Sequence, residues 1–361
     1  MHDVRNVLSH YPFDCQPAQI EPLGSAGGMS GAQFWRITVR DVRGSPAQVV
    51  RGSPDPARRT LCLRRWPTEH PSRERLQFIH AVLSHAERNG ITCLPVPITT
   101  KDGQSFVDHA GHLWELAPWL PGTADYDHSP SRAKLGTAMS ALANFHRATI
   151  DFPIATSQWL AGQPPPIAKR LAKLQQLTHS AANELAHSIT DTTWPDLAPL
   201  ARQFIAALSN AVPRAIAQLE PLASIPLPLQ VCLRDIWHDH VLFTGDEVTG
   251  IVDFGAVDVD TPATDIARLL GSLVPTSPPR RAEGPGEGHL EAEHWQTGLA
   301  AYSAIRPLSE EEMRAVKALD SSGTILAGCN WLRWIYIEGR DFENRAAIVQ
   351  RFCRIMARVA P

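Results

Sequence analysis

Residues 233–255 read LRDIWHDHVLFTGDEVTGIVDFG and interrupt a region whose pattern is otherwise helical. Within this stretch, Thr244-Gly245-Asp246-Glu247 has the composition of a tight turn between two apolar strands, which predicts an antiparallel hairpin. Asp235 precedes the hairpin and Asp253 follows it. The stretch therefore predicts two carboxylates at the ends of one short β-rich segment, bounded at residues 227–255.

Two carboxylates at this spacing suit phosphoryl transfer from ATP. That reaction needs one carboxylate near the acceptor hydroxyl and another that holds Mg²⁺ against the phosphates, since positioning and charge stabilise its transition state. Asp235 and Asp253 fit these two roles. The plain alternative is that both residues are turn formers or helix caps, as Asp often is.

Three short segments extend the pattern beyond the two acids. The kinase pattern consists of H-[RG]-D-x-x-x-x-N, then a strand pair, then [IV]-D-F. This order is matched here by Arg234-Asp235, Val241-Leu242-Phe243 and Val252-Asp253-Phe254. Downstream, residues 260–267 (DTPATDIA) are similar to G-D-P-x-x-D-[LI]-A. The chain thus resembles aminoglycoside phosphotransferases, choline kinases and homoserine kinases of the second type. The resemblance implies an α+β, bilobal protein-kinase-like fold, with a small antiparallel-sheet N-lobe and a larger, mainly helical C-lobe.

The resemblance also implies roles for individual residues. Asp235 would be the catalytic base, with Arg234 beside it in the same motif, and Asp253 would be a metal ligand. Asp265 would be a structural carboxylate that braces the catalytic loop. The implied cofactors are ATP and Mg²⁺, and the implied substrate is a small hydroxyl compound: an amino alcohol, a sugar, an amino acid or an aminoglycoside-like molecule.

The motif departs from the family at three positions. Leu233 replaces a His, Trp237 stands where these small-molecule kinases often have His, and His240 replaces the Asn of the second metal site. Mg²⁺ prefers oxygen ligands, so His240 as a metal ligand predicts a weakened second site or a preference for Mn²⁺. Alternatively, His240 forms hydrogen bonds within the loop together with His238 and Asp239.

A glycine-rich stretch near the N-terminus would let backbone N–H groups approach phosphate closely. Residues 24–31 read GSAGGMSG and precede an alternating strand at residues 33–39. The stretch resembles the family's G-G-x-S-N loop, whose positions correspond here to Gly27, Gly28, Ser30 and Gly31. A glycine-rich turn between strands is also common in β proteins that bind no nucleotide.

The strand at residues 60–66 (TLCLRRW) has a period of two that puts Cys62 and Arg64 on one face. The family holds phosphates with a Lys at this place, so the resemblance makes Arg64 the phosphate-binding residue. Its acidic partner is expected from the following helix, where Glu69 and Glu74 are candidates. A solvated arginine at a strand end is the alternative.

The segment at residues 113–122 (LWELAPWLPG) resembles the family's lobe connector. The resemblance implies adenine contacts from the main chain of Glu115 and Ala117. Core packing followed by a proline turn is the alternative. Further on, residues 330–336 (NWLRWIY) place aromatics and Arg on a predicted helix that lines either an acceptor pocket beside Asp235 or the core.

Periodicity predicts the remaining organisation. A strand at residues 112–119 and a helix at 71–89 complete a sheet-rich N-terminal lobe (residues 1–118). A helical C-terminal lobe (residues 119–361) contains helices at residues 131–148, 168–187 and 197–222, and a flexible linker at residues 276–289.

Composition narrows the partners. The 361 residues carry a formal net charge of -3 without long runs of one sign, which argues against a nucleic-acid or membrane partner. Six dispersed cysteines and an N-terminus interrupted by charge and proline predict reduced thiols and a cytoplasmic location. The oligomeric state is not determined by these observations.

The sequence is compatible with three functional hypotheses. The first is an active small-molecule kinase, which the presence of both Asp235 and Asp253 favours. The second is a catalytically weak or inactive pseudokinase that binds nucleotide or acts as a scaffold, which Leu233 and His240 favour. The third is a helical protein with a β-hairpin insert and no kinase fold.

Overall fold

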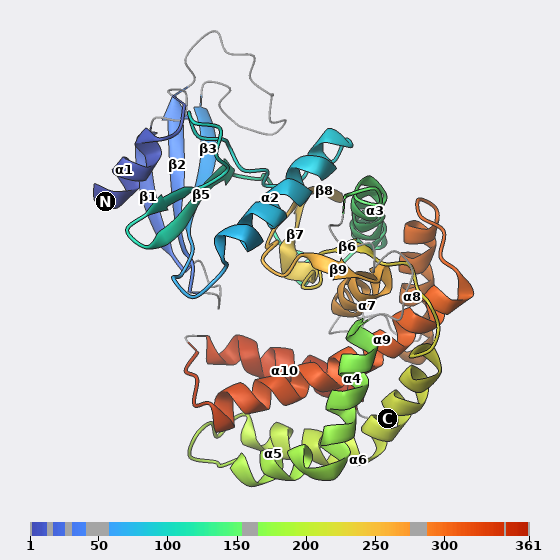
Figure 1. Ribbon diagram of the computed structural model, residues 1–361. Coiled ribbons are helices and arrows are strands. Elements are labelled where there is room, and N and C mark those ends of the chain that lie inside the picture. The colour runs from blue at the N-terminus through green and yellow to red at the C-terminus, as the bar shows by residue number, and fades with distance from the viewer. Residues whose placement is uncertain are drawn as a thin grey trace. The chain divides into compact units, whose positions relative to one another are not determined.

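Figure 1 shows the chain in a computed structural model, which describes residues 2–12, 17–25, 31–40, 58–153, 165–274, 287–342 and 344–359. The chain divides into two compact units: unit 1 comprises Met1–Phe152 and His238–Val257, and unit 2 comprises Pro153–Trp237 and Asp258–Pro361. Each unit is described by itself.

Unit 1 is built on a five-stranded antiparallel sheet in the order β1-β2-β3-β5-β4. Its strands are β1 (Pro17–Gly24), β2 (Gln33–Arg40), β3 (Arg58–Arg65), β4 (Val107–His109) and β5 (His112–Pro118). The strands predicted at residues 33–39, 60–66 and 112–119 are confirmed as β2, β3 and β5. The two outer strands, β1 and β4, were not predicted.

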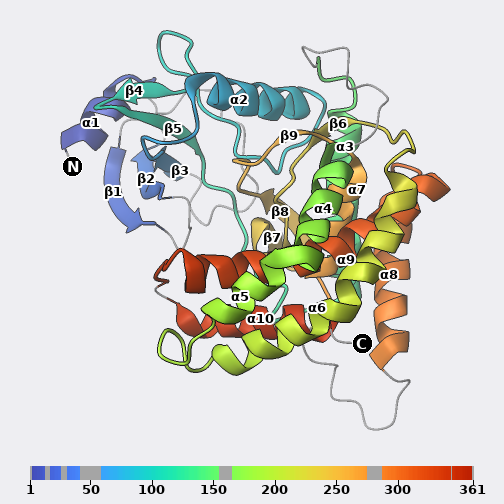
Figure 2. The same ribbon diagram turned by 60° about the horizontal axis from the view of Figure 1, so that its bottom comes forward.

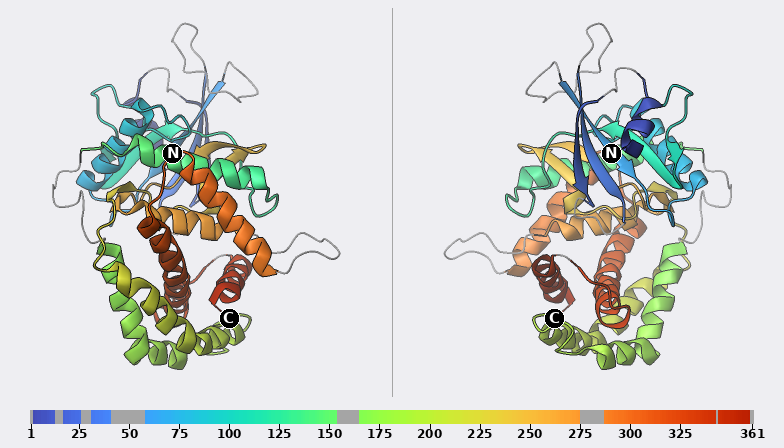
Figure 3. Two further views of the ribbon diagram at one scale, coloured as in Figure 1. Left: turned by 90° about the vertical axis from the view of Figure 1, so that its right-hand side faces the viewer. Right: turned by 90° about the vertical axis from the view of Figure 1, so that its left-hand side faces the viewer.

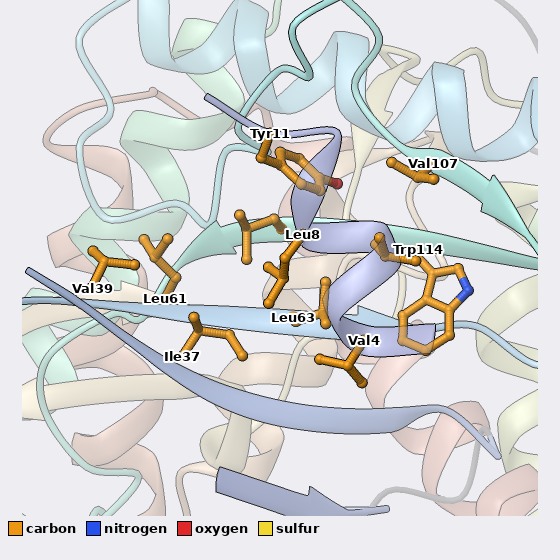
Figure 4. Close-up of a cluster of buried hydrophobic side chains, with 11 residues drawn as sticks. Val4, Leu8, Tyr11, Ile37, Val39, Leu61, Leu63, Val107 and Trp114 are labelled. Atoms are coloured by element: carbon orange, nitrogen blue, oxygen red, sulfur yellow. The ribbon is translucent and has the colours of Figure 1, made fainter. Parts of the chain in front are cut away.

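One face of this sheet is covered by the N-terminal helix α1 (His2–Ser9). Figure 3 shows α1 beside the sheet, and Figure 4 shows the apolar side chains that join them. Each fully buried Leu or Ile here contributes on the order of 1.5–3 kcal/mol. The cluster comprises Val4, Val7, Leu8, Tyr11, Ile37, Val39, Leu61, Leu63, Val107, Trp114 and Leu116.

The helix α2 (Arg73–Arg88) joins a second buried cluster, formed by Trp66, Leu76, Phe106 and Leu113. Its N-terminus is capped by Ser72, and Gly90 follows its end with a φ of 92°, as expected for a C-terminal glycine. The helix predicted at residues 71–89 is therefore confirmed. Because strand residues alternate between faces, Cys62 and Arg64 lie on the opposite face from Leu61 and Leu63, as predicted.

The predicted hairpin is also confirmed and belongs to unit 1. It consists of β7 (Val241–Thr244) and β8 (Glu247–Ile251), which pair antiparallel around Gly245 at a φ of 63°. The helix α3 (Arg132–Ala148) packs against β8, so α3 and the hairpin group with the sheet. This grouping differs from the lobe boundary predicted at residue 118, which stays a prediction.

Unit 2 is mainly helical, as Figure 2 shows. Its helices are α4 (Pro165–Gln176), α5 (Ala182–Ser188), α6 (Ala198–Leu219), α7 (Pro262–Ser272), α8 (Glu287–Ser303), α9 (Glu310–Leu332) and α10 (Arg345–Val359). The Phe204 ring of α6 packs on Phe352 of α10, and a Cβ at Gly328 of α9 would lie only 2.3 Å from Phe204. This close approach requires glycine at position 328.

Two details of unit 2 differ from the predictions. The helix predicted at residues 168–187 is divided by a π-helical turn at Leu177–Ala181. The flexible linker predicted at residues 276–289 falls mostly outside the described residues, but its last three residues already belong to α8. No helix in the described ranges has both the length and the apolar character needed to cross a membrane.

Candidate active site

The backbone of the catalytic motif is held in unit 2 by Asp265, near the start of α7. Its buried carboxylate accepts hydrogen bonds from the backbone N–H groups of Leu233 and Arg234, each at 2.6 Å. The two residues directly follow β6 (Gln230–Cys232), which pairs with β9 (Asp258–Asp260). The bracing role that the resemblance implied for Asp265 is therefore confirmed.

The Asp265→Asn variant is expected to be destabilised by about 1–3 kcal/mol, because an amide has only one acceptor oxygen and leaves a buried N–H unpaired. Chemical denaturation of wild type and variant measures this difference. Asp196→Asn, an exposed acid of the same unit, serves as the control and should leave stability unchanged. Equal stability of wild type and Asp265→Asn would contradict the bracing role.

Asp235, two residues after Leu233, is accessible to a substrate. Its side chain is 45% exposed and forms an ion pair with Arg268, which lies one turn beyond Asp265 on α7. Sequence reasoning missed Arg268, although a cation three residues after Asp265 on a helix was a detectable signal. The pair keeps the Asp235 carboxylate beside α7 and leaves it open to solvent.

Arg234 directs its side chain toward β9. Its guanidinium lies 3.2 Å from Asp258 and 3.5 Å from Asp260. Burial raises the pKa of Asp260 to about 6, and the charge of Asp265 adds to this, while the bond from Thr261 N–H and the charge of Arg234 oppose it. These contacts are those of a positioning residue, and a direct catalytic part for Arg234 stays a prediction.

Asp253 and His240 lie together in unit 1, at the end of the hairpin. His240 Nε2 is 3.7 Å from Asp253 Oδ2, and the Asp253 side chain is 47% exposed. Ligands on adjacent corners of a divalent-metal site lie about 3 Å apart, so a small movement would bring both atoms onto one ion. The pair fits a divalent metal, and its mixed oxygen and nitrogen donors suit Mn²⁺ better than Mg²⁺.

The neighbours of His240 behave differently. His238 Nδ1 lies 2.9 Å from Asp239 Oδ1, and His238 Nε2 lies 3.5 Å from Asp127 Oδ2. His238 and Asp239 thus form the local contacts that the alternative interpretation expected. His240 instead faces Asp253, as a metal ligand would.

Backbone strain marks the same motifs. Among the described non-glycine residues, positive φ occurs at Ala110, Arg234 and Asp253. A non-glycine residue in this region of conformational space is uncommon and is often retained at functional sites. Two of these three residues lie at the predicted catalytic and metal-binding motifs.

Arg64 of β3 lies in a partly closed aromatic and acidic environment of unit 1. Its guanidinium carbon is 3.3 Å from the ring centroid of Trp66 and 5.3 Å from that of Phe34, and its Nη1 is 3.8 Å from Glu115 Oε1. Its Nε is buried and has no hydrogen-bond partner among the residues that the structure describes. An anion bound here would supply that missing partner.

Arg64 and Asp253 interact electrostatically within unit 1. Burial lowers the pKa of Arg64, and the charges of Glu115 and Asp253 act in the opposite direction. Gly255 lies close both to Asp253 and to Trp66, the ring that Arg64 packs on. A Cβ at Gly255 would lie 3.5 Å from Asp253 Oδ1 and 3.7 Å from the Trp66 ring. The candidate phosphate-binding cation is therefore in the same neighbourhood as the candidate metal ligand.

The acid beside Arg64 is Glu115 of the neighbouring strand, so the expectation of Glu69 or Glu74 is wrong. Antiparallel register places Glu115 directly opposite Arg64, whereas Glu69 and Glu74 are exposed. Glu74 lies in the first turn of α2, where its own backbone N–H and the Ser72 hydroxyl stabilise its carboxylate. Side chains that stand directly opposite each other on paired strands are close neighbours, so Glu115 is better placed to reach Arg64 than an acid of the following helix.

The same register argues against adenine contacts from the main chain of Glu115 and Ala117. The flanking bonds Trp66 N to Leu113 O (2.9 Å) and Trp119 N to Thr60 O (3.1 Å) bracket the β3–β5 ladder. In an antiparallel ladder every second pair of opposite residues exchanges main-chain hydrogen bonds. Counting in from the two flanking bonds, the pairs that do so are Arg64–Glu115 and Cys62–Ala117. The main-chain groups of Glu115 and Ala117 are thus directed at β3.

The glycine-rich stretch is described only at its ends. Gly31, at the start of the chain into β2, has a φ of 74° that suits glycine. The other predicted phosphate-loop residues, Gly27, Gly28 and Ser30, lie outside the described residues.

The C-terminal aromatic segment is linked to the catalytic motif of unit 2 through Arg351. Trp331 is buried against Trp334 and Phe342, with ring centroids 5.2 and 5.4 Å apart. Arg351 of α10 lies over both Trp237 (3.9 Å) and Trp331 (5.4 Å). The segment thus contributes to the core, and Arg351 of α10 connects it to Trp237, two residues after Asp235.

Two solved structures of similar fold are a phosphotransferase and a kinase by name. Spectinomycin phosphotransferase in complex with ADP and spectinomycin has a TM-score of 0.63 at 10% identity, covering 97% of this chain and 94% of that one. An amicoumacin kinase in complex with AMP-PNP and Ca²⁺ has a TM-score of 0.61 at 14% identity, covering 97% and 92%. The kinase-like fold predicted from the motifs is therefore confirmed.

A curated relative of similar sequence is the homoserine kinase of Azorhizobium caulinodans, which is 28% identical over 244 residues. The match spans 68% of this chain and 64% of the relative, which is less than two thirds of that protein's length. The model of the phosphotransferase enzyme family matches residues 40–308, which is more than half of the chain and includes Arg64, Asp235, Asp253 and Asp265. The chain therefore belongs to the phosphotransferase enzyme family.

Proposed function

We propose that this protein is an ATP-dependent phosphotransferase that moves the γ-phosphate to a hydroxyl group of a small molecule. The observation that carries the proposal is the neighbourhood of Arg64 and Asp253 in unit 1. A mostly buried cation, whose buried Nε–H has no partner among the described residues, lies there beside a half-exposed carboxylate. A nucleotide triphosphate with its metal ion needs these two groups together. Membership of the phosphotransferase family supports the same proposal.

Asp235 is proposed as the base that accepts the proton of the acceptor hydroxyl. Its carboxylate is half exposed, and its backbone is fixed through Asp265, so it can be presented to a substrate in a constant orientation. Arg268 must release or share Asp235 when the acceptor binds. Arg268 is then available to the incoming hydroxyl compound or to the transferred phosphate.

Asp253 and His240 are the residues that would hold the divalent metal. A bound divalent ion neutralises charge on the phosphate oxygens. The amicoumacin kinase with AMP-PNP and Ca²⁺ supports a nucleotide with a divalent cation. Mg²⁺ or Mn²⁺ is proposed for this chain, with Mn²⁺ favoured by the imidazole of His240.

A pseudokinase is the second candidate function. Leu233 is buried at 2% exposure in place of the family's His, and Arg268 neutralises Asp235 in this structure. Nucleotide binding that stabilises the fold without any product would favour this candidate.

A direct assay separates the two functions. Purified protein is mixed with ATP, Mg²⁺ or Mn²⁺ and a panel of hydroxyl compounds that includes homoserine, amino alcohols, sugars and aminoglycosides, and products are detected by mass. We expect one class to gain a phosphoryl group in a metal-dependent reaction. Thermal stabilisation by ATP with no product from any class would contradict the kinase and leave the pseudokinase. The predicted cytoplasmic location stays a prediction.

A further inference from the structure

The ion pair around Arg64 continues to a third residue on α2. His80 is 4% exposed, and its Nε2 lies 2.6 Å from Glu115 Oε2, while its Nδ1 lies 2.8 Å from the Ser105 hydroxyl. Nε2 donates to the carboxylate, and Nδ1 accepts from the Ser105 hydroxyl when the ring is neutral or donates to it when the ring is charged, so both ring nitrogens are satisfied in either state. Both oxygens of Glu115 are then engaged, one by Arg64 and one by His80.

Several contacts restrict these three side chains. Glu115 stands directly opposite Arg64 in the β3–β5 ladder, and the side chains of both are about 15% exposed. Arg64 lies on the Trp66 ring, and His80 packs near Phe106 with ring centroids 6.2 Å apart. A long arginine loses much conformational freedom in such a site, so its charge can be held in one place before a ligand arrives.

The carboxylate of Glu115 is ionised in this arrangement. Burial alone would raise its pKa, but the hydrogen bond from His80 and the attraction to His80 and Arg64 outweigh burial and lower the pKa. Glu115 is therefore an anion with two fixed partners, which is what the orientation of a guanidinium requires.

We propose that Glu115 and His80 are positioning residues for Arg64: Glu115 orients the guanidinium toward bound phosphate, and His80 anchors Glu115 to α2. This inference rests on the proposed function, since it takes Arg64 to bind the phosphates of ATP. In this arrangement α2 contributes to phosphate binding through His80, which holds Glu115 of β5. The acid that pairs with Arg64 therefore comes from the sheet and not from α2. Movement of α2 relative to the sheet is thereby transmitted to Arg64.

The test compares MgATP with adenosine, because only MgATP has phosphates for Arg64. Calorimetric dissociation constants are measured for wild type, His80→Phe, Glu115→Gln and the double variant. Each single change is expected to weaken MgATP binding by about tenfold, the scale of one charge-assisted hydrogen bond, with adenosine binding unchanged. The double variant should be no weaker than Glu115→Gln alone, because His80 acts through Glu115.

Matched variants guard against a loss of folding. His80→Gln retains a donor for Glu115 and should bind MgATP more tightly than His80→Phe. His85→Gln changes another histidine of α2, one bonded to the exposed Asp151, and should bind both ligands like wild type.

The possible outcomes are distinct. Tighter MgATP binding by Glu115→Gln would show that Glu115 only neutralises Arg64, and equal losses for MgATP and adenosine would show a merely structural role; either overturns the proposal. Unchanged variants beside a wild type that binds MgATP overturn it as well, without affecting the proposed function. A wild type that binds no MgATP contradicts the proposed function, and the positioning role is then lost with it.

Discussion

Replacement of Asp235 by Asn lowers the rate of phosphoryl transfer by about 10²–10⁴-fold, the range that general-base catalysis contributes. Asparagine has nearly the same size as aspartate but cannot take a proton from the acceptor hydroxyl. It also loses the charge that pairs with Arg268. The rate is measured as phosphorylated product per unit time with the acceptor found in the panel assay.

Two controls make this result specific. Glu247→Gln, an exposed acid at the start of β8, should retain the wild-type rate. Melting temperature and MgATP affinity of Asp235→Asn should also match those of wild type, since Asp235 is half exposed. An Asp235→Asn variant that still transfers phosphate at the wild-type rate would exclude Asp235 as the base.

Replacement of Asp253 by Asn is expected to reduce metal-dependent turnover at least about 100-fold, because the charge stabilisation supplied by a bound metal is worth several kcal/mol. Asn is the most conservative choice here, since it tolerates the φ of 64° that Asp253 adopts. The loss would then reflect the missing charge and not a changed backbone.

The measurement is a titration of turnover with Mg²⁺ and with Mn²⁺ at saturating ATP. Asp253→Asn should need far more of either ion, and wild type should reach half-maximal turnover at a lower concentration of Mn²⁺ than of Mg²⁺, because His240 offers nitrogen. Adenosine affinity provides the internal control and should not change. Identical metal titrations for wild type and variant would remove Asp253 from the metal site.

The three departures from the family pattern, Leu233, Trp237 and His240, each have defined surroundings in this structure. Leu233 is buried apolar, while Asp265 holds the backbone of the same loop without any help from a side chain at position 233. Position 240 faces Asp253, and Trp237 lies under Arg351. The three departures therefore change the side-chain chemistry of the motif, while Asp265 still holds the backbone at positions 233 and 234.

Local sequence patterns were sufficient to predict most of the secondary structure in the described residues. Strands β2, β3 and β5, helices α2 and α3, and the hairpin around Gly245 all follow from apolar periodicity and turn chemistry, which act over a few residues. The outer strands β1 and β4 escaped prediction, because β1 carries two prolines and a mixed pattern and β4 has three residues. The π-helical turns at Leu177–Ala181 and Arg333–Ile337 of unit 2 have no comparable sequence signal.

The order of the motifs along the chain and the suitability of Asp235 and Asp253 for phosphoryl transfer could be inferred from residue types and spacing. The role proposed for Arg64 came from the resemblance to the family. The partners of these residues could not be inferred in either way. His80 reaches Glu115 across 35 positions, and Arg268 reaches Asp235 across 33. A buried histidine on the core face of α2 signals that some partner exists. Which partner it is depends on strand register and helix packing, and these are properties of the folded chain.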